Sequence, residues 1–237
     1  MNPWIALLAA VVGCFIGSIS FARVVARLVS PDKDVTRVDI PTSAGGTHTL
    51  VSVGGTAVGL KLGPKWGGTT ALLDILKVAI PTLAFRLAFS GQPYFMIVAL
   101  AGIIGHVWPV YYRFKGGGGM SAIYGGLLVV DWVGALVTSF LGLSLGLVLR
   151  NTLIFYLGGI VLIIPWMVLR WGDWPHIVYG VAINVLFGLA MIPELKQTIE
   201  RRRQGEPAGD FDHEMDMTPM GRMIAKMLKR WSPKAKS

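Results

Sequence analysis

The chain has 237 residues, of which 53% are hydrophobic and 15% are charged, and its formal net charge is +9. A soluble globular domain carries about 25% charged residues. The deficit here is concentrated in long stretches, such as residues 67–112 with three charges. This composition excludes a soluble single-core domain and predicts one all-α, polytopic membrane protein. The single cysteine, Cys14, excludes an intrachain disulfide and a cysteine-based metal site.

The first apolar segment covers residues 3–22, without a basic stretch before it or an A-x-A cleavage pattern near its end. We therefore expect a retained helix and not a removed signal peptide. Residues 31–66 follow, and they are rich in Gly, Ser, Thr and Pro. Loops of this length are usually functional or disordered. Apolar residues between the glycines favour an ordered loop that lies against the membrane.

Further apolar segments predict a bundle of seven transmembrane helices. The fourth and fifth spans are short and turn at Asp131-Trp132, and Pro193 fits the end of the last span. Three tryptophans fit an aromatic belt at the outer membrane face: Trp132, Trp171 and Trp174. The expected spans are 3–22, 67–88, 92–112, 119–131, 133–149, 152–169 and 175–193.

Positive charge predicts the orientation of this bundle. Of 22 Lys and Arg residues, 18 lie in residues 23–65, in residues 113–115 or after Pro193. Because basic loops stay in the cytoplasm, we expect all three segments there and the N-terminus outside. Seven spans satisfy this arrangement. The basic character therefore indicates topology and anionic lipid, and no nucleic acid is expected as a partner.

The chain divides by composition into a membrane domain, residues 1–206, and a cytoplasmic tail, residues 207–237. Residues 218–231 predict a basic amphipathic helix that lies on the anionic leaflet of the membrane. Packing of this helix on the protein's own cytoplasmic face is the alternative. Its apolar positions are Met220, Met223, Ile224, Met227, Leu228 and Trp231, and its basic positions are Arg222, Lys226, Lys229 and Arg230.

The most informative stretch is His106–Gly119, at the end of the uncharged segment 94–110. It combines a histidine, two cations and four consecutive glycines. Glycines let main-chain N–H groups approach a ligand, and a nearby cation adds charge, so the pattern suits a phosphate. The run is not a P-loop, because it lacks the G-K-[ST] sequence and a preceding strand. We therefore predict a phosphate site at a membrane boundary.

Asp74 and Lys77 are three residues apart in the second span, so they share one face of a helix. Charges inside a membrane are costly unless they are paired or face a polar cavity. Two interpretations stay open: a purely structural ion pair, and a functional role of Lys77 near the four consecutive glycines, Gly116–Gly119, called the glycine run below. His106 could likewise be a hydrogen-bonded core residue, and Gly17-Ser18 could serve close helix packing alone.

Taken in order, these motifs resemble the bacterial acyl-phosphate:glycerol-3-phosphate acyltransferase family, the PlsY type. The resemblance covers about residues 5–206, and Gly105–Gly119 is its specific motif. It implies a seven-helix bundle in the bacterial inner membrane with its site facing the cytoplasm. It also implies acyl transfer from an acyl phosphate to glycerol 3-phosphate, without a cofactor. The other matching stretches are Gly17–Ser20, Leu62–Gly67, Leu73–Lys77 and Ile199–Glu206.

The resemblance implies His106, Lys115 and Ser18 as catalytic residues, with His106 orienting or deprotonating the acceptor hydroxyl. Lys115, Lys77 and Arg201 would neutralise phosphate, while the glycine amides would bind phosphate or the developing oxyanion. Asp74 is expected as the ion-pair partner of Lys77, and no metal is implied. The expected substrate-binding residues are Lys77, Thr56, Ser52, Gly116, Gly117, Gly118, Gly119 and Arg201.

Several polar positions of the family pattern hold other residues here. These positions are Ser52, Ala57, Leu60, Gly118, Leu195 and Thr198. Their loss removes groups that would recognise glycerol 3-phosphate. Two alternatives therefore stay open: an acyltransferase with a different small anionic acceptor, and a non-catalytic lipid-binding protein or transporter.

Overall fold

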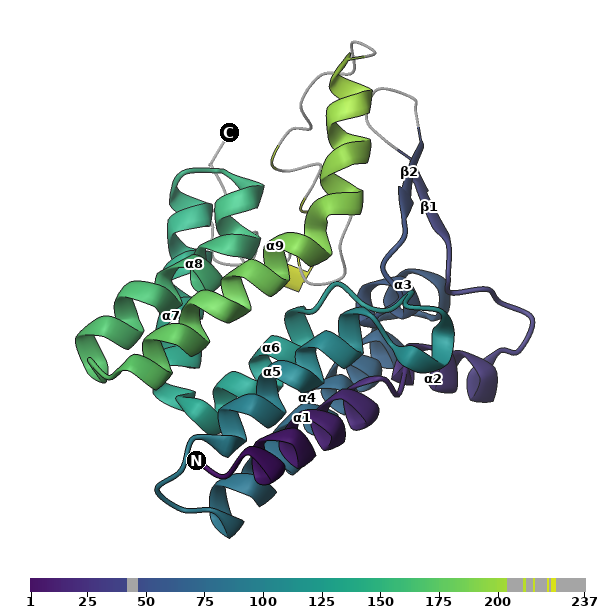
Figure 1. Ribbon diagram of the computed structural model, residues 1–237. Helices are drawn as coiled ribbons and strands as arrows, with labels where there is room; N and C mark the ends of the chain where they lie inside the picture. Colours follow the sequence, from purple (N-terminus) through teal and green to yellow (C-terminus); the bar gives the residue numbers. More distant parts are fainter. Residues whose placement is uncertain (42–46, 204–210, 212–214, 216–220, 222, 225–237) are drawn as a thin grey trace.

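The computed structural model describes residues 1–41, 47–203, 211, 215, 221 and 223–224, and it is almost entirely helical (Figure 1). The side chains of Pro41, Thr47, His48, Arg201 and Arg202 lie outside the description. The elements are α1 (Pro3–Gly17), α2 (Phe21–Val29), β1 (Val38–Pro41), β2 (Thr47–Leu50), α3 (Gly55–Leu62), α4 (Pro64–Ala88), α5 (Tyr94–Val107), a 3-10 turn (Val110–Tyr112), α6 (Met120–Val130), α7 (Trp132–Val148), α8 (Thr152–Arg170) and α9 (Trp174–Arg203).

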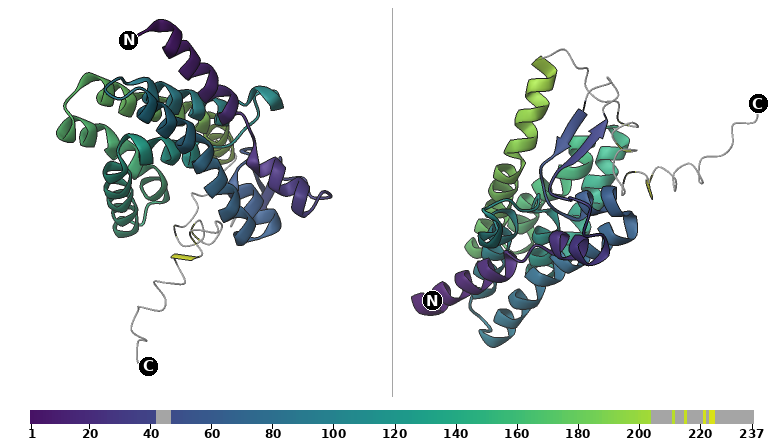
Figure 2. Two further views of the ribbon diagram at one scale, coloured as in Figure 1. Left: turned by 90° about the horizontal axis from the view of Figure 1, so that it is seen from below. Right: turned by 90° about the vertical axis from the view of Figure 1, so that its right-hand side faces the viewer.

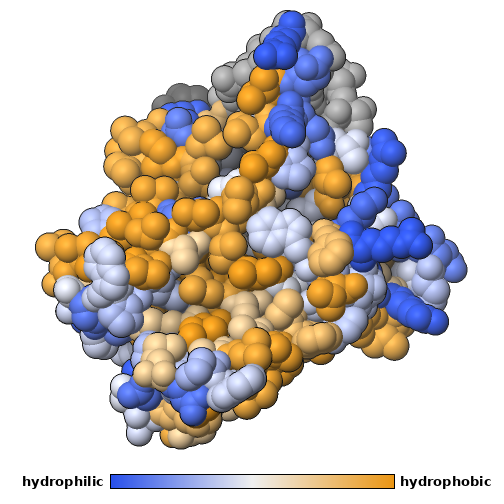
Figure 3. Space-filling view, in the orientation of Figure 1, coloured by the Kyte–Doolittle hydropathy of each residue, from blue (hydrophilic) through white to orange (hydrophobic). Residues whose placement is uncertain are grey.

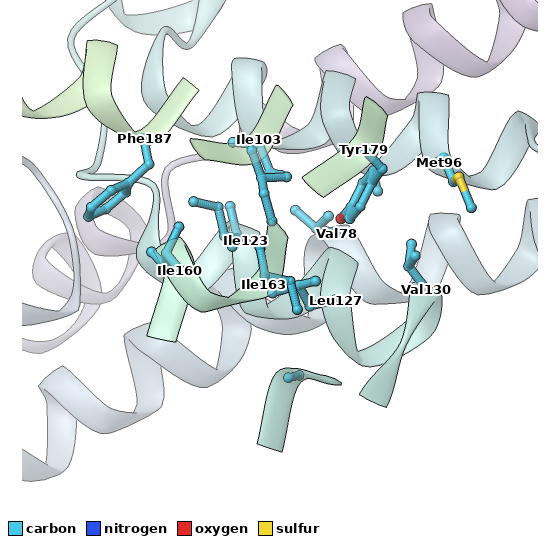
Figure 4. Packing of buried hydrophobic residues seen from close by; sticks show 14 of the residues in the cluster. Val78, Met96, Ile103, Ile123, Leu127, Val130, Ile160, Ile163, Tyr179 and Phe187 are labelled. Atoms are coloured by element: carbon cyan, nitrogen blue, oxygen red, sulfur yellow. The ribbon is translucent and has the colours of Figure 1, made fainter. Parts of the chain in front are cut away.

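Most of the helices pack around the largest buried apolar cluster. Helix α1 packs on α5, α4 packs on α5 and α6, α7 pairs with α8, and α9 contacts α5 and α8 (Figures 1 and 2). Six helices supply the cluster, through Val78, Ile103, Ile123, Ala135, Ile163 and Ile183 among others, and Figure 4 shows several of these side chains packed together. This core packs the middle of α4 against α5 and α6, next to the candidate site.

Glycines allow α1 and α5 to approach closely. A Cβ atom at Gly17 would overlap the carbonyl group of Gly102, and one at Gly105 would overlap the carbonyl oxygen of Cys14. Small residues at such crossings are typical of membrane helices, because apolar lipid provides no hydrophobic drive for association and close contact must supply it. The crossing fixes Ser18, at the end of α1, beside the end of α5.

The surface fits a multi-pass membrane protein. In the described residues, four segments are long and apolar enough to cross a membrane: Pro3–Val29, Tyr94–Tyr112, Thr152–Arg170 and Trp174–Glu200. Hydrophobic residues cover α7, α8 and the first half of α9, whereas hydrophilic residues gather around the β1–β2 hairpin and the far end of α9 (Figure 3). Side chains such as Phe140, Leu153 and Leu169 are 68–85% exposed, as lipid-facing residues would be.

The sequence predicts one helix through residue 22 for the first apolar segment, but the structure divides this segment into two helices. Helix α1 ends at Gly17, and α2 starts separately at Phe21. Ser20 occupies the N-cap position of α2 with an extended backbone, and Ser18 is the C-cap of α1. The Ser18 hydroxyl bonds the carbonyl oxygen of Cys14 in the last turn of α1, whereas the Ser20 hydroxyl makes no capping bond and accepts from Arg23.

The described part of the 31–66 stretch is ordered, whereas its predicted position against the membrane stays a prediction. It contains the antiparallel pair β1–β2, in which Val38 lies opposite Leu50, and helix α3. Val38 and Leu50 are buried with Ala57 in a small apolar cluster. The strands themselves are not predicted from the sequence.

The predicted turn between the fourth and fifth spans is confirmed at Asp131, between α6 and α7. Its Oδ1 accepts from the N–H of Gly134 at 2.9 Å. Its Oδ2 accepts from the indole N–H groups of Trp166 at 2.8 Å and Trp171 at 2.9 Å, and lies 3.2 Å from Arg170 Nε. Burial opposes the charge of Asp131, but these donors outweigh it and hold the pKa of its carboxyl group below its ordinary value.

Helix α9 does not end at Pro193, contrary to the prediction, but continues to Arg203. A proline inside a helix removes one hydrogen bond and bends the helix, and it does not always end it. Figure 1 shows α9 changing direction along its length. The bend carries its charged end toward the β1–β2 hairpin. The predicted tail helix 218–231 lies almost wholly outside the described residues.

Candidate active site

One face of α4 carries buried polar residues toward the centre of the molecule. Thr70, Asp74 and Lys77 are 0–6% exposed, and their spacing of four and three residues aligns them along this face. Lys77 Nζ lies 2.7 Å from Asp74 Oδ1. From α5, His106 Nδ1 lies 3.6 Å from the same oxygen. The aspartate is thus shared between a lysine and a histidine, which keeps two costly charges paired.

The break between α1 and α2 supplies a further partner for this group. Lys77 Nζ donates to the carbonyl oxygen of Ile19 at 2.6 Å. Ile19 follows the end of α1, so its carbonyl is available to a side chain. The lysine therefore joins α4 to the first apolar segment as well as neutralising Asp74.

Ser18 ties the same break to the segment after α5. Its hydroxyl donates to the carbonyl oxygen of Cys14 at 2.8 Å and accepts from the N–H of Val110 at 3.2 Å. The residue is fully buried. These bonds hold the start of the 110–115 segment beside the end of α1.

The glycine run folds back over His106. The N–H of Gly117 donates to the carbonyl oxygen of His106 at 3.1 Å, and the carbonyl oxygen of Gly116 accepts from the N–H of Val53 at 2.8 Å. A Cβ atom at Gly117 would overlap the imidazole ring of His106. Gly119 has φ +89° at the N-cap of α6, where glycine is favoured. The run therefore needs glycine for close contact and for a turn.

Ser52 and Glu194 complete this side of the site. A Cβ atom at Gly118 would lie 3.7 Å from the Ser52 hydroxyl oxygen, so Ser52 and the glycine run are neighbours. The carboxyl group of Glu194, from α9, lies beside the Ser52 hydroxyl. Glu194 belongs to none of the sequence motifs described above. Its place directly after Pro193, at the end of an apolar span, is the signal that could have identified it.

Arg23 is a second residue near the site that belongs to none of the sequence motifs described above. From the first turn of α2 it reaches the segment before the glycine run, where its Nη2 donates to the carbonyl oxygen of Lys115 at 2.8 Å. The available signal is an arginine just after the break in an apolar segment, which demands a polar partner.

The predicted residues do not all converge. Ser18, Ser52, Asp74, Lys77, His106 and the glycines form one continuous set of contacts. Lys115 and Thr56 have exposed side chains. The side chain of Arg201 lies outside the described residues. Within the described part of the chain, no group of three or more His, Cys, Asp or Glu side chains is arranged to hold a metal ion.

Comparison with known proteins places this geometry in a family context. A family model described as glycerol-3-phosphate acyltransferase matches residues 7–205. A glycerol-3-phosphate acyltransferase of Mycoplasma mycoides subsp. mycoides is 36% identical over 53% of this chain and 46% of its own length. Glycerol-3-phosphate acyltransferase 1 of Lactobacillus johnsonii is 31% identical over 60% of this chain and 64% of its own. The chain spans about half the length of the first curated relatives that it matches.

Two solved structures share the fold. Both are crystal structures of PlsY, an integral membrane glycerol 3-phosphate acyltransferase, with a TM-score of 0.67 over 86% of this chain and 94% of the other. The lysophosphatidic acid form is 24% identical to this chain, and the glycerol 3-phosphate form is 26% identical. Since the family model covers most of the sequence, the chain belongs to the glycerol-3-phosphate acyltransferase family.

Proposed function

We propose that this protein is a membrane acyltransferase that moves an acyl chain from an acyl phosphate to glycerol 3-phosphate in phospholipid synthesis. One observation carries the proposal: the glycine run, His106 and the Asp74–Lys77 pair meet where α5 ends and α6 begins. A phosphate-bearing lipid precursor needs such a place, because its chain stays in the membrane while its charged end needs polar partners.

The chemistry requires little from the protein. The acceptor hydroxyl oxygen attacks the acyl carbonyl carbon, a new C–O ester bond forms, and the bond from that carbon to the phosphate oxygen breaks. The hydroxyl proton passes to His106 or to a phosphate oxygen. Phosphate is already a good leaving group, so alignment and stabilisation of negative charge are the main contributions of the site.

The glycine run offers donors for that negative charge. Gly117 N–H is already bonded to His106, and among the described residues the N–H groups of Gly116, Gly118 and Gly119 have no main-chain partner. They precede α6, whose positive helix end adds to the attraction for an anion. We assign anion binding to these three amides and the positioning of Gly117 to His106.

The other site residues take roles that follow from their contacts. Lys77 neutralises phosphate charge while paired with Asp74, Ser18 holds the 110–115 segment, and Ser52 contributes a hydroxyl near Gly118. Lys115 acts as an exposed cation that attracts the anionic substrates. Thr56 and Arg201 stay proposed substrate contacts on the basis of family resemblance.

We further propose seven membrane spans in a bacterial inner membrane, with the N-terminus outside and the site facing the cytoplasm. Two contacts support a common outer end: Asn2 N–H donates to the Tyr94 hydroxyl, and Arg86 donates to the Val129 carbonyl. The N-terminus and the α4–α5 and α6–α7 turns therefore lie together, opposite the glycine run. In this proposal residues 1–206 form the membrane domain, and the 207–237 tail places helix 218–231 on the anionic leaflet.

A second acceptor class follows from one observation, the Ser52–Glu194 contact beside Gly118. A carboxylate near the run repels a second anionic group and favours an acceptor rich in hydroxyls. The activity is tested with purified protein in detergent, an acyl phosphate and a panel that includes glycerol 3-phosphate, glycerol and inositol phosphate. Acylation of glycerol 3-phosphate, reduced in His106→Gln and Lys115→Ala, supports the main proposal. Acylation of another acceptor supports the second, and lipid binding without any transfer contradicts both.

A further inference from the structure

We propose that Arg23 is a positioning residue that sets the conformation of the 110–115 segment and thereby the entry of the chain into the glycine run. The inference rests on the proposed function, because it assigns Arg23 a part in placing the anion-binding amides. No resemblance to a family motif points to this residue. The contacts of its guanidinium group carry the argument.

The guanidinium group makes three contacts from one position. Nη2 donates to the carbonyl oxygen of Lys115 at 2.8 Å, and Nη1 donates to the Ser20 hydroxyl at 3.1 Å. Its Cζ lies 4.4 Å from the centre of the Tyr112 ring, a cation–π distance. The planar fork of arginine can meet all three at once, whereas a lysine ammonium is a single point of charge.

The segment that Arg23 holds is strained. Arg113 and Phe114 have φ values of +52° and +61°, and side-chain-bearing residues rarely adopt this left-handed region. Two such residues in succession persist only where the surroundings enforce them. The N–H groups of Phe114 and Lys115 bond the carbonyl oxygens of Pro109 and Tyr112, both at 3.1 Å, so the turn is closed on itself. Arg23 fastens this turn to α2 directly after the strained pair.

The carbonyl that Arg23 binds belongs to the residue next to Gly116. Main-chain hydrogen bonds hold the next two residues, because Gly116 is bonded to Val53 and Gly117 is bonded to His106. The glycine run is thus fixed from the 52–54 side and from α5, and Arg23 fixes its start from α2. Without Arg23 the strained turn can relax, and the free amides of the run then lose their alignment.

Arg27 provides a matched control. It lies one turn later on α2, carries the same charge and is exposed. Substitution of either arginine removes one positive charge from the same helix. A difference between Arg23→Gln and Arg27→Gln therefore reports the contacts of Arg23 and not the net charge of the surface.

The first readout is activity. Arg23→Gln is expected to lower kcat/KM for acyl transfer by about tenfold or more, because small displacements of positioned groups are costly. Arg23→Lys restores only part of the activity, and Arg27→Gln stays within about twofold of the unchanged protein. Equal losses in Arg23→Gln and Arg27→Gln, or a loss that only follows thermal stability, would overturn the proposal.

The second readout does not depend on catalysis. Trypsin cleavage after Arg113 or Lys115, followed by mass spectrometry of protein in detergent, reports whether the turn is held. Faster cleavage in Arg23→Gln than in Arg27→Gln supports the positioning role, and equal cleavage contradicts it. An inactive unchanged protein would contradict the proposed function alone, because the cleavage comparison still decides the role of Arg23.

Discussion

Lys77 donates to the main-chain carbonyl of Ile19 across the junction between α4 and the break that follows α1. The same ammonium group lies 2.7 Å from Asp74 Oδ1. One side chain thereby neutralises a buried carboxylate and bonds the main chain where the first apolar segment changes direction. The break is what makes this carbonyl available.

Lys77→Met is expected to destabilise the protein, because it leaves the Asp74 carboxylate buried beside His106 alone. Removal of one partner from a buried ion pair costs about 3–5 kcal/mol. The double variant Asp74→Asn/Lys77→Met should be more stable than the sum of the single effects predicts, since no unpaired charge remains. Thermal unfolding in detergent, followed by tryptophan fluorescence, measures all three. Additive single effects would show that the two charges are independent.

Gly117→Ala should lower acyl transfer by about 100-fold, because misplacing a catalytic group by about 1 Å can cost that much. The added Cβ would lie 2.7 Å from His106 Cε1 and force the imidazole aside. Gly118→Ala is the matched change one residue later, where the Cβ meets Ser52 at an ordinary 3.7 Å. We expect a much smaller loss there, since the main-chain N–H is retained. Similar rates in the two alanine variants would contradict the packing of Gly117 on His106.

Gly67→Ala and Gly68→Ala should differ in stability although they are adjacent in α4. A Cβ at Gly67 would lie 2.6 Å from Gly59 Cα, so α3 must move away. A Cβ at Gly68 would meet nothing within 4 Å. Gly68→Ala is therefore expected to stabilise the helix by up to about 1 kcal/mol. Unfolding midpoints of both variants test this, and a loss in Gly68→Ala equal to that in Gly67→Ala would rule out the α3–α4 contact.

Asp131 should make the free energy of unfolding depend on pH in the acidic range. Its folded-state pKa is lowered, so its contribution is present above the unfolded value of about 3.9 and is lost as the pH falls through the folded value. Asp131→Asn should lower stability at pH 7 by about 1–3 kcal/mol and flatten the loss of stability below about pH 4. The exposed Asp32→Asn serves as a control. An unchanged acid limb in Asp131→Asn would contradict the assignment.

The sequence predicts the regular helices well because their apolar segments are long and their ends carry clear signals. The turn at Asp131 is predicted because a charged residue interrupts two apolar runs, and the Asp74–Lys77 contact because both lie on one face of α4. The convergence of His106 with this pair follows from motif order in the family resemblance. These features are predictable because each depends on residues close together in the chain or on a specific family motif.

The remaining features depend on contacts between residues far apart in the chain. The β1–β2 hairpin includes Pro41 and lacks an Asn-Gly or Asp-Gly pair, so the strongest short-range hairpin signal is absent from the sequence. The separate helix α2 starts after a break at residues 18–20, where Lys77 bonds the carbonyl oxygen of Ile19 from the distant helix α4. Arg23 bonds a carbonyl 92 residues away, and composition cannot indicate which carbonyl an arginine finds.

The short helix α6 has a consequence for where the reaction takes place. Its 11 residues rise about 16 Å, whereas the hydrocarbon core of a bilayer is about 30 Å thick. If Asp131 lies at the outer boundary, Gly119 reaches only about halfway to the cytoplasmic surface. The amides then lie within the depth of the bilayer and not at its surface. A lipid-borne donor would need to rise very little to meet a soluble acceptor there.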